Sequence, residues 1–482
     1  MINLQDKEMA EMKKEPLYIR IANIMEVQIE SGTLKTGDKL PSIRSVQKLY
    51  NISINTVKQA YLLLESKSLI EPRPKFGYFV SKAATRKFSL PSVGKMKKAT
   101  QEKDPKDLIS KVFNALADQT ITQFSVCGPD ETLLPVAKLN KCLINTVRRM
   151  NKTELNYEPI QGSTNLRRNI AKWSWVLEGK LTEDDIVTTS GATNAIFNCL
   201  MAVTKPGDTI AIESPVYFSI HQFVKSLGLK VIEIPTHPVT GIDLESVKKV
   251  LPRLSACCFI SNFSNPLGSL MPDEHKKELV RMLTEYDIPL IEDDLYGNLF
   301  FGAERPKPCK FYDEAGIVMW CNSVSKTLAP GYRVGWVAPG KYKEEIIRQK
   351  LVQTISTPSL YQEVIADFLD NGRYDHHLRT LRSKLHANCL KFQGAIEEYF
   401  PADTKISQPQ GGFMLWLELN KKIDTAELFD LAIKQKISFA PGRMFTQHDQ
   451  YNNCMRLNFA SEWSDKIDNG LKRLGRLVKA AL

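Results

Sequence analysis

The stretch SVSKTLAPGYR, residues 323–333, decides the fold of the larger part of this chain. It follows an apolar run that is typical of a buried strand. A lysine just beyond such a strand, Lys326, can form a Schiff base with a cofactor aldehyde. The hydroxyls of Ser323 and Ser325 and the guanidinium of Arg333 can hold the phosphate of the same cofactor. The stretch therefore predicts a site for pyridoxal 5′-phosphate (PLP).

Short apolar runs alternate with amphipathic stretches through the rest of this region. Such runs are typical of strands buried in parallel sheets, and helical spacing separates most of them, as at 274–286. The alternation predicts an α/β domain at 123–482 with a mainly parallel central sheet and a smaller α+β part at 370–482. A GxGxxG motif does not occur, which disfavours a dinucleotide-binding fold. The runs lie at 186–189, 209–212, 230–234, 257–260, 289–291 and 317–320.

Polar and aromatic side chains follow several of these strands, at the edge where α/β sheets bind ligands. Ala192 and Thr193 stand where a loop opens a helix, and free N–H groups at a helix start suit a phosphate. Asp293 ends a strand, so its carboxylate can pair with the pyridine nitrogen of PLP and keep the ring an electron sink. The remaining candidates are Tyr217, which can stack on the ring, and Asn265 with Tyr296, which can reach its phenolate oxygen.

Composition sets bounds on the class of protein. The hydrophobic fraction of 43% and the charged fraction of 25% are those of a globular protein, and no stretch approaches the ~20 apolar residues of a membrane span. The polar start has no signal-peptide core, and the nine cysteines have no CxxC spacing, which favours a reduced, cytoplasmic setting. The seven histidines have no metal-binding spacing, so we expect no metal site.

The first 80 residues contain three helical patterns followed by a hairpin pattern. Apolar residues repeat with helical spacing, and Ser42 and Ser53 are suited to cap the second and third helices. Residues 69–80 have the pattern of two short strands around a turn that contains Pro, Lys and Gly. Three helices and a wing in this order predict a winged helix-turn-helix at 1–80 that binds DNA. The alternative is a small helical domain that binds protein.

The segments GDKLPSIR at 37–44 and SINTV at 53–57 closely resemble the GntR family of bacterial regulators. The resemblance implies that the third helix enters the major groove of DNA while the wing tip also contacts DNA. One departure is Ile54, where many relatives carry an arginine that can contact phosphate or base. The residues that would face DNA are Arg44, Ser53, Asn55, Thr56, Lys58, Lys75 and Gly77.

A basic segment joins the two predicted domains. Residues 81–110 carry a net charge of +5, nearly half of the formal +11 of the whole chain, and Pro, Ser and Gly interrupt any periodicity there. We therefore expect a flexible basic linker at 81–122. It can lie along a DNA backbone, or it can be a solvated tether without a partner.

The residues at the predicted strand ends, in this order, strongly resemble the fold-type I aminotransferases, especially the branch of aminoadipate and kynurenine aminotransferases. The resemblance implies that Tyr157 reaches the cofactor phosphate of the partner subunit and that Arg456 clamps the carboxylate of an amino acid. One departure is Thr193, where a glutamine is frequent, and another is Leu267, where a threonine is frequent. The resemblance places the phosphate of PLP on Thr193, Ser323, Ser325 and Arg333.

A GntR-type domain followed by an aminotransferase-like domain resembles the MocR-type transcription regulators, and this resemblance implies a homodimer. It also implies that Lys326 holds PLP as an internal aldimine and that an amino acid, an amine or PLP itself is the effector that changes DNA binding. The competing hypothesis is an active aminotransferase with an accessory DNA-binding domain, so transaminase activity stays open, slow or vestigial. A third hypothesis is a protein-interaction module built on an inactive enzyme, and the intact Lys326 disfavours it.

Overall fold

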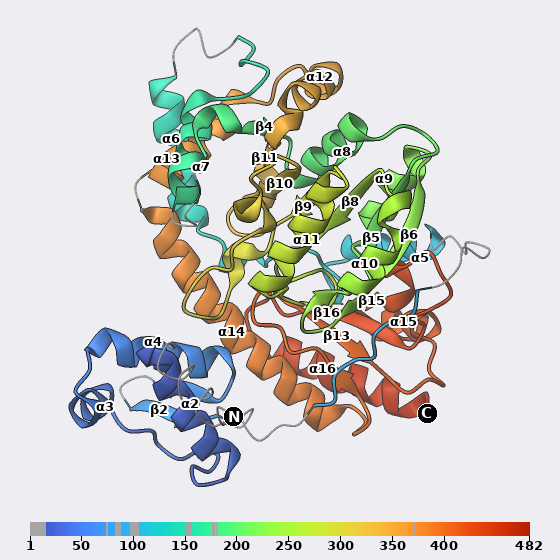
Figure 1. The fold of residues 1–482 in the computed structure, drawn as a ribbon. Helices are drawn as coiled ribbons and strands as arrows, with labels where there is room; N and C mark the ends of the chain where they lie inside the picture. The colour runs from blue at the N-terminus through green and yellow to red at the C-terminus, as the bar shows by residue number, and fades with distance from the viewer. Residues whose placement is uncertain are drawn as a thin grey trace, which may run out of the picture. The chain divides into compact units, whose positions relative to one another are not determined.

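The computed structural model describes residues 16–73, 76–81, 88–96, 106–150, 156–175, 179, 181–370 and 372–482. The chain divides into two compact units (Figure 1), a smaller one mainly from Met1–Phe88 and a larger one mainly from Ser89–Leu482. A search of the helices within these ranges found none with the length and apolar character needed to cross a membrane.

The described part of the smaller unit contains three helices and one hairpin. Its helices are α2 (Leu17–Glu30), α3 (Ile43–Tyr50) and α4 (Ile54–Ser66), and its antiparallel strands are β1 (Ile70–Arg73) and β2 (Gly77–Val80). The Ser42 hydroxyl accepts the Ser45 N–H at 3.1 Å, and the Ser53 hydroxyl accepts the Thr56 N–H at 3.0 Å. Both serines are therefore the helix caps that the sequence predicted. The core that joins the helices includes Ile21, Met25, Val46, Val57, Tyr61 and Leu64.

The larger unit is built on an eight-stranded sheet with the strand order β4-β11-β10-β9-β8-β5-β6-β7. The central strands β10, β9, β8, β5 and β6 run parallel to one another, whereas β11 is antiparallel to both of its neighbours. The strands are β4 (Val187–Thr189), β5 (Thr209–Ser214), β6 (Lys230–His237), β7 (Gly241–Ile242), β8 (Ala256–Phe259), β9 (Leu290–Asp293), β10 (Val318–Ser323) and β11 (Gly335–Ala338). The predicted, mainly parallel central sheet is confirmed.

Helices cover both faces of this sheet, so its strands are apolar on both sides. One apolar cluster joins the sheet to α8 (Ala192–Val203), α9 (Phe218–Ser226) and α12 (Lys343–Thr354). A second cluster joins it to α10 (Leu244–Val250) and α11 (Asp273–Glu285). A third cluster includes Trp320 and Trp336 of the sheet and residues of α6 (Val136–Arg149), α7 (Thr164–Ser174) and α13 (Ser359–Asp370).

A smaller α+β part follows at the C-terminal end, as predicted from about residue 370. It begins with the 27-residue helix α14 (Arg373–Tyr399). Its four-stranded sheet has the order β12-β13-β16-β15, formed by Lys405–Ile406, Met414–Glu418, Cys454–Asn458 and Ala440–Pro441. The helices α15 (Thr425–Lys434) and α16 (Asp465–Ala480) complete it, and β14 (Ile437–Ser438) pairs in parallel with β3 (Thr122–Gln123).

Two described pieces of the predicted linker 81–122 are packed on the larger unit. The carbonyl of Ser89 accepts the N–H of Ile406 at 3.1 Å, and the Ser92 hydroxyl donates to Glu418 at 3.1 Å. Further on, α5 (Lys106–Leu116) places the ring of Phe113 edge-on against that of Phe218, with the ring centres 5.4 Å apart. Hydrogen bonds therefore tie Ser89 and Ser92 to the four-stranded sheet. An aromatic contact ties α5 to α9. Residues 82–87 and 97–105 lie outside the described residues.

Candidate cofactor and effector site

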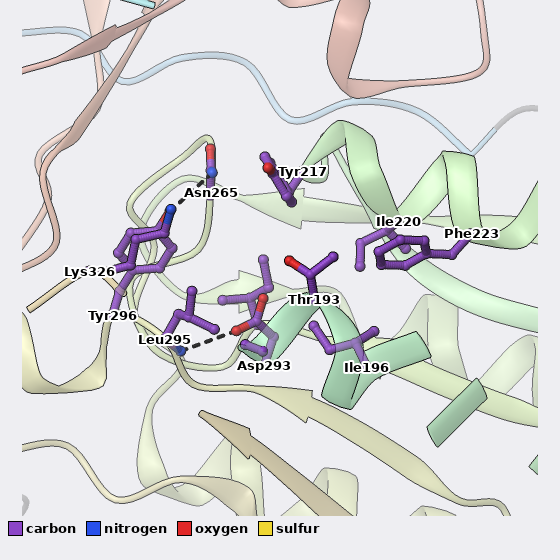
Figure 2. A pocket seen from close by; sticks show the side chains of 12 residues that line it. Thr193, Ile196, Tyr217, Ile220, Phe223, Asn265, Asp293, Leu295, Tyr296 and Lys326 are labelled. Carbon is purple, nitrogen blue, oxygen red and sulfur yellow. Dashed lines mark hydrogen bonds between the residues drawn. The ribbon is translucent and has the colours of Figure 1, made fainter. Parts of the chain in front are cut away.

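A pocket opens at the carboxyl ends of the parallel strands, where an α/β sheet binds ligands. Most of the residues that the sequence singled out for PLP line it. Figure 2 shows Asn265, Tyr296 and Lys326 grouped on one side, Thr193 and Asp293 near the middle, and Ile220 and Phe223 on the far side. The lining residues are Ala192, Thr193, Ile196, Tyr217, Ile220, Phe223, Ile260, Asn265, Asp293, Leu295, Tyr296 and Lys326.

Lys326 projects into this pocket from the turn that follows β10. Its Nζ donates a hydrogen bond to the backbone carbonyl of Cys127, a residue nearly 200 positions earlier in the chain. Burial lowers the pKa of the Lys326 amine, and the positive charges of Arg456 and Arg333 act in the same direction. A lysine with a lowered pKa is more often neutral, and only the neutral amine attacks a carbonyl carbon.

Asp293 ends β9 at the floor of the pocket. Its side chain is buried and its Oδ1 accepts the N–H of Leu295 at 3.1 Å. Burial raises the pKa of this carboxyl to about 7, although the Leu295 N–H opposes the shift. A cation bound next to Asp293 would favour its charged form, because an opposite charge favours ionisation.

Asn265 links Tyr296 to Arg456 beside the pocket. Its Nδ2 donates to the Tyr296 Oη at 3.2 Å, and its Oδ1 accepts from Arg456 Nη1 at 3.2 Å. Burial raises the pKa of the Tyr296 phenol, so this group stays neutral and keeps its proton. The amide, phenol and guanidinium therefore form one connected array beside Lys326.

Arg456 lies in the middle of β16 with only 1% of its surface exposed. Its guanidinium donates to the carbonyl of Ser125 and, at 3.4 Å, to that of Val126, and it lies 3.3 Å from the Cys127 sulfur. Within the described ranges its Nε has no hydrogen-bond partner. A buried guanidinium that neutral carbonyls hold, and that has one donor unused, is suited to bind a carboxylate.

The residues predicted for the phosphate meet at the start of α8. Arg333 donates from Nη1 to the Ser325 hydroxyl and from Nη2 to the Ser190 carbonyl, both at 3.2 Å. The Ser323 hydroxyl accepts the N–H of Ser325 at 3.1 Å. Gly191 has a φ of +82°, and a Cβ built there would lie 2.4 Å from Arg333 Nη2. The arginine therefore packs over a glycine that has no side chain to keep it away.

Tyr157 is not part of this pocket. Its side chain is 81% exposed, as expected for a residue that would reach a partner subunit, although that role stays a prediction. Sequence reasoning did not single out Ser125, Val126 or Cys127, which contact Lys326 and Arg456. The sequence signal nearby is the Gly128-Pro129 pair, which marks a loop but not the residues before it.

In the smaller unit the described residues predicted to face DNA lie on α3, at the start of α4 and at the wing. Arg44, Asn55 and Lys58 are exposed, and Gly77 at the wing is exposed with a φ of +98°. The Ser53 hydroxyl accepts the backbone N–H of Thr56 and so caps the helix, and it lies 2.8 Å from the Thr56 hydroxyl. The predicted contact Lys75 lies outside the described residues.

Two families of known proteins match this chain. Residues 127–474 match the family described as aminotransferase class I and II, and residues 17–80 match the bacterial regulatory proteins of the gntR family. The uncharacterized HTH-type transcriptional regulator YjiR of Escherichia coli (strain K12) is 36% identical over 96% of this chain and 99% of its own. YdcR of the same strain, which has the same description, is also 36% identical, over 98% and 100%.

Solved structures of aminotransferases resemble the larger unit. The Pyrococcus horikoshii kynurenine aminotransferase in complex with PMP, KYN and KYA is 27% identical with a TM-score of 0.73, over 80% of this chain and 96% of that one. The α-aminoadipate aminotransferase LysN of Thermus thermophilus, complexed with N-(5′-phosphopyridoxyl)-L-leucine, is 26% identical with a TM-score of 0.71, over 77% and 94%.

The larger unit is thus a fold-type I aminotransferase fold, with its pocket at the carboxyl ends of the strands. Because full-length relatives share both parts in the same order, the chain belongs to the MocR-type regulators, in which a GntR-type domain precedes an aminotransferase class I and II domain. This membership confirms the fold class, the domain fusion and the cofactor expected from the sequence, PLP.

Proposed function

We propose that this protein is a PLP-dependent transcription regulator whose DNA binding responds to a small amine, an amino acid or PLP itself. The observation that carries the proposal is the meeting of Lys326, Asp293 and Asn265 at one pocket. Arg456 is hydrogen-bonded to Asn265 there, and the same chain also contains a winged helix-turn-helix. We expect it to act in the cytoplasm, where bacterial DNA is found.

The residues of the pocket fit PLP. Lys326 supplies an amine with a lowered pKa for the cofactor aldehyde, and Asp293 supplies a buried carboxyl for the pyridine nitrogen. The N–H groups at the start of α8, the Ser323 and Ser325 hydroxyls and the Arg333 guanidinium supply donors for the phosphate. The space over Gly191 supports this assignment, because a side chain there would displace Arg333. When bound, PLP supplies an aldehyde that amines attack and a ring that withdraws electrons.

The surrounding residues orient the cofactor and control protons. Tyr296 and Asn265 offer hydrogen bonds to an oxygen on the ring, and the neutral phenol keeps its proton for this purpose. Tyr217, which borders the pocket, offers an aromatic face to the ring. The Lys326 amine, when it is not attached to the cofactor, could accept and return protons within the pocket as a general base.

Arg456 points to an effector that carries a carboxylate. A carboxylate accepts two parallel hydrogen bonds from a guanidinium, and its negative charge adds an attraction that a neutral carbonyl does not offer. It would therefore compete well with the carbonyls of Ser125 and Val126 that Arg456 now contacts. An amino acid carries an amino group for PLP and a carboxylate for Arg456, whereas a simple amine carries only the first of these groups.

DNA binding is assigned to the exposed start of α4 and its neighbours. Arg44 and Lys58 supply positive charge, and Asn55 supplies an amide that can read a base edge. Ser53 can still contact phosphate while it caps the helix, and Thr56 can do so while its hydroxyl contacts Ser53, because a hydroxyl both donates and accepts. The wing would add contacts through Lys75 and Gly77.

A homodimer would bring two such heads to paired half-sites. The exposed apolar side chains on α12 and just after it support a subunit contact at the larger unit: Leu351, Val352 and Ile355 are 44%, 81% and 48% exposed. Tyr157, which is also strongly exposed, would reach the PLP phosphate of the partner in such a dimer.

A working aminotransferase is the second candidate function. It is favoured by the completeness of the pocket, which has the amine, the ring carboxylate, the phosphate donors and the carboxylate clamp. Turnover separates the two candidates, because an enzyme would convert an amine donor and an oxo acid continuously. A regulator would stop after binding the amine, or complete a slow half-reaction.

Fluorescence anisotropy tests the regulator proposal. The purified protein is titrated onto labelled DNA from upstream of its own gene, with and without PLP, and onto scrambled DNA of equal length. Specific binding that changes with PLP is the expected result. Binding no tighter than to scrambled DNA, together with sustained conversion of an amine donor, would replace the regulator by the aminotransferase.

A further inference from the structure

Helix α14 holds the residue that follows Lys326. Thr327 is fully buried, and two side chains from the start of α14 contact it. His377 Nε2 lies 2.6 Å from the Thr327 carbonyl oxygen, and Tyr374 Oη lies 2.8 Å from the Thr327 hydroxyl. Residues three apart on a helix project from the same face, so one turn of α14 reaches both the backbone and the side chain of Thr327.

The direction of these hydrogen bonds follows from their chemistry. A carbonyl only accepts, so His377 must carry its proton on Nε2, and burial favours the neutral imidazole by lowering the pKa of His377. Asn298 donates to Tyr374 Oη at 3.4 Å, which leaves the phenol proton for Thr327. The Thr327 hydroxyl in turn lies 3.5 Å from the Val324 carbonyl. Every group in this chain of contacts can therefore be satisfied.

The turn that carries Lys326 also has bonds of its own. The N–H groups of Leu328 and Ala329 both donate to the Val324 carbonyl, at 2.9 and 3.1 Å. These bonds fix the shape of the turn, but they join neighbours in the chain and cannot fix its position in the protein. The contacts from Tyr374 and His377 come from a helix about 50 residues away in the chain. These contacts can therefore fix the position of the turn in the protein.

We propose that Tyr374 and His377 are positioning residues for Lys326, which hold its backbone so that the amine stays directed into the PLP pocket. The inference rests on the proposed function, because it takes Lys326 as the residue that attaches PLP. Neither side chain needs to touch the cofactor. Their effect would be on the rate and the tightness of PLP attachment.

The test uses the full-length protein freed of PLP and a set of matched variants. Tyr374→Phe removes one hydroxyl, and its control Tyr399→Phe removes the hydroxyl of another α14 tyrosine, which bonds Asp468. His377→Leu removes the imidazole, and its control is His376→Leu at the exposed neighbouring histidine. His377→Gln restores an N–H donor. PLP is then added, and the visible absorption band that depends on Lys326 is followed over time and with PLP concentration.

We expect Tyr374→Phe and His377→Leu each to weaken PLP attachment by roughly fivefold, which corresponds to the loss of about one net hydrogen bond. The two controls should bind PLP as the wild type does, and His377→Gln should recover part of the loss. Thermal unfolding of the PLP-free variants separates this effect from simple destabilisation. If His377→Leu fails to fold, Tyr374→Phe alone decides.

Tyr374→Phe with wild-type rate and tightness of PLP attachment would overturn the inference, as would equal losses in Tyr374→Phe and Tyr399→Phe. A wild-type protein without a Lys326-dependent band would instead defeat the proposed function itself. A second check uses Thr327→Val, which removes the hydroxyl that Tyr374 contacts. The effects of Thr327→Val and Tyr374→Phe should not add, because both remove the same bond.

Discussion

Replacing Gly191 by alanine should weaken PLP binding as well as folding, whereas an alanine at a comparable glycine away from the site should weaken folding alone. Gly191 has a φ of +82° and a ψ of 168°, a backbone conformation essentially restricted to glycine that costs an alanine about 1–3 kcal/mol. The new Cβ would also lie 2.4 Å from Arg333 Nη2 and 2.9 Å from its Cζ, whereas an ordinary contact needs about 3.5 Å. The guanidinium must therefore move by about 1 Å, which breaks its 3.2 Å bonds to Ser325 and Ser190.

The loss of PLP affinity follows from the donor that moves away. A hydrogen bond to a charged group contributes about 1.5–3 kcal/mol, so a phosphate deprived of Arg333 should bind roughly 10- to 100-fold more weakly. Gly207→Ala is the matched control, because Gly207 has a φ of +90° and nothing within 4 Å of an added Cβ. This control should lose similar stability and keep its PLP affinity.

Visible absorption during titration with PLP measures the affinity, and thermal unfolding of the PLP-free proteins measures the stability. If Gly191→Ala bound PLP as tightly as Gly207→Ala, the phosphate would not depend on Arg333. The assignment of the phosphate to the start of α8 would then have to be withdrawn.

Three other predictions concern Asp293, Lys326 and the DNA-binding face. Because burial raises the pKa of Asp293 to about 7, its contribution to PLP-free stability is present below the unfolded pKa and is lost as the pH rises through 7. The wild type should therefore lose at most on the order of 4 kcal/mol of unfolding free energy as the pH rises, and Asp293→Asn should not show this loss. Denaturant unfolding between pH 4 and 8 measures it, and an unchanged pH dependence in the variant would contradict the assigned burial. Lys326→Ala should abolish the visible PLP band while the protein still elutes as a folded dimer; an unchanged spectrum would exclude Lys326 as the attachment site. Arg44→Ala with Lys58→Ala should weaken DNA binding and flatten its salt dependence, and wild-type binding would show that DNA lies on another face.

Much of the site could be predicted from the sequence because its residues lie at strand ends. Lys326, Asp293 and Asn265 each follow an apolar run, and parallel strands bring their carboxyl ends to one edge. The caps Ser42 and Ser53 were equally predictable, because capping depends on neighbours within three residues.

The contacts that could not be predicted join distant parts of the chain. The carbonyls of Ser125 and Val126 bond Arg456 through groups that every residue possesses, so side-chain identity gives no signal. Helical spacing relates Leu17, Ile21, Ile24 and Met25 in the sequence, which predicts one buried face, yet Leu17 and Ile24 are 46% and 43% exposed. In a small domain the apolar stripe is wider than the surface that its few neighbours can cover.

The segment from α5 to Gly128 has a thermodynamic consequence for regulation. This stretch follows the DNA-binding unit in the chain, and it ends on the amine and the guanidinium of the pocket. A ligand that binds the Lys326 amine and the Arg456 guanidinium would compete with their hydrogen bonds to Cys127 and Ser125, and so would change the free energy of this stretch. Linkage then requires reciprocity, so whatever factor an effector applies to operator affinity, operator DNA must apply to effector affinity. If an effector changes operator affinity as proposed, operator DNA must change the affinity of the pocket for that effector, and the concentration of effector needed for a response would differ between free and DNA-bound protein.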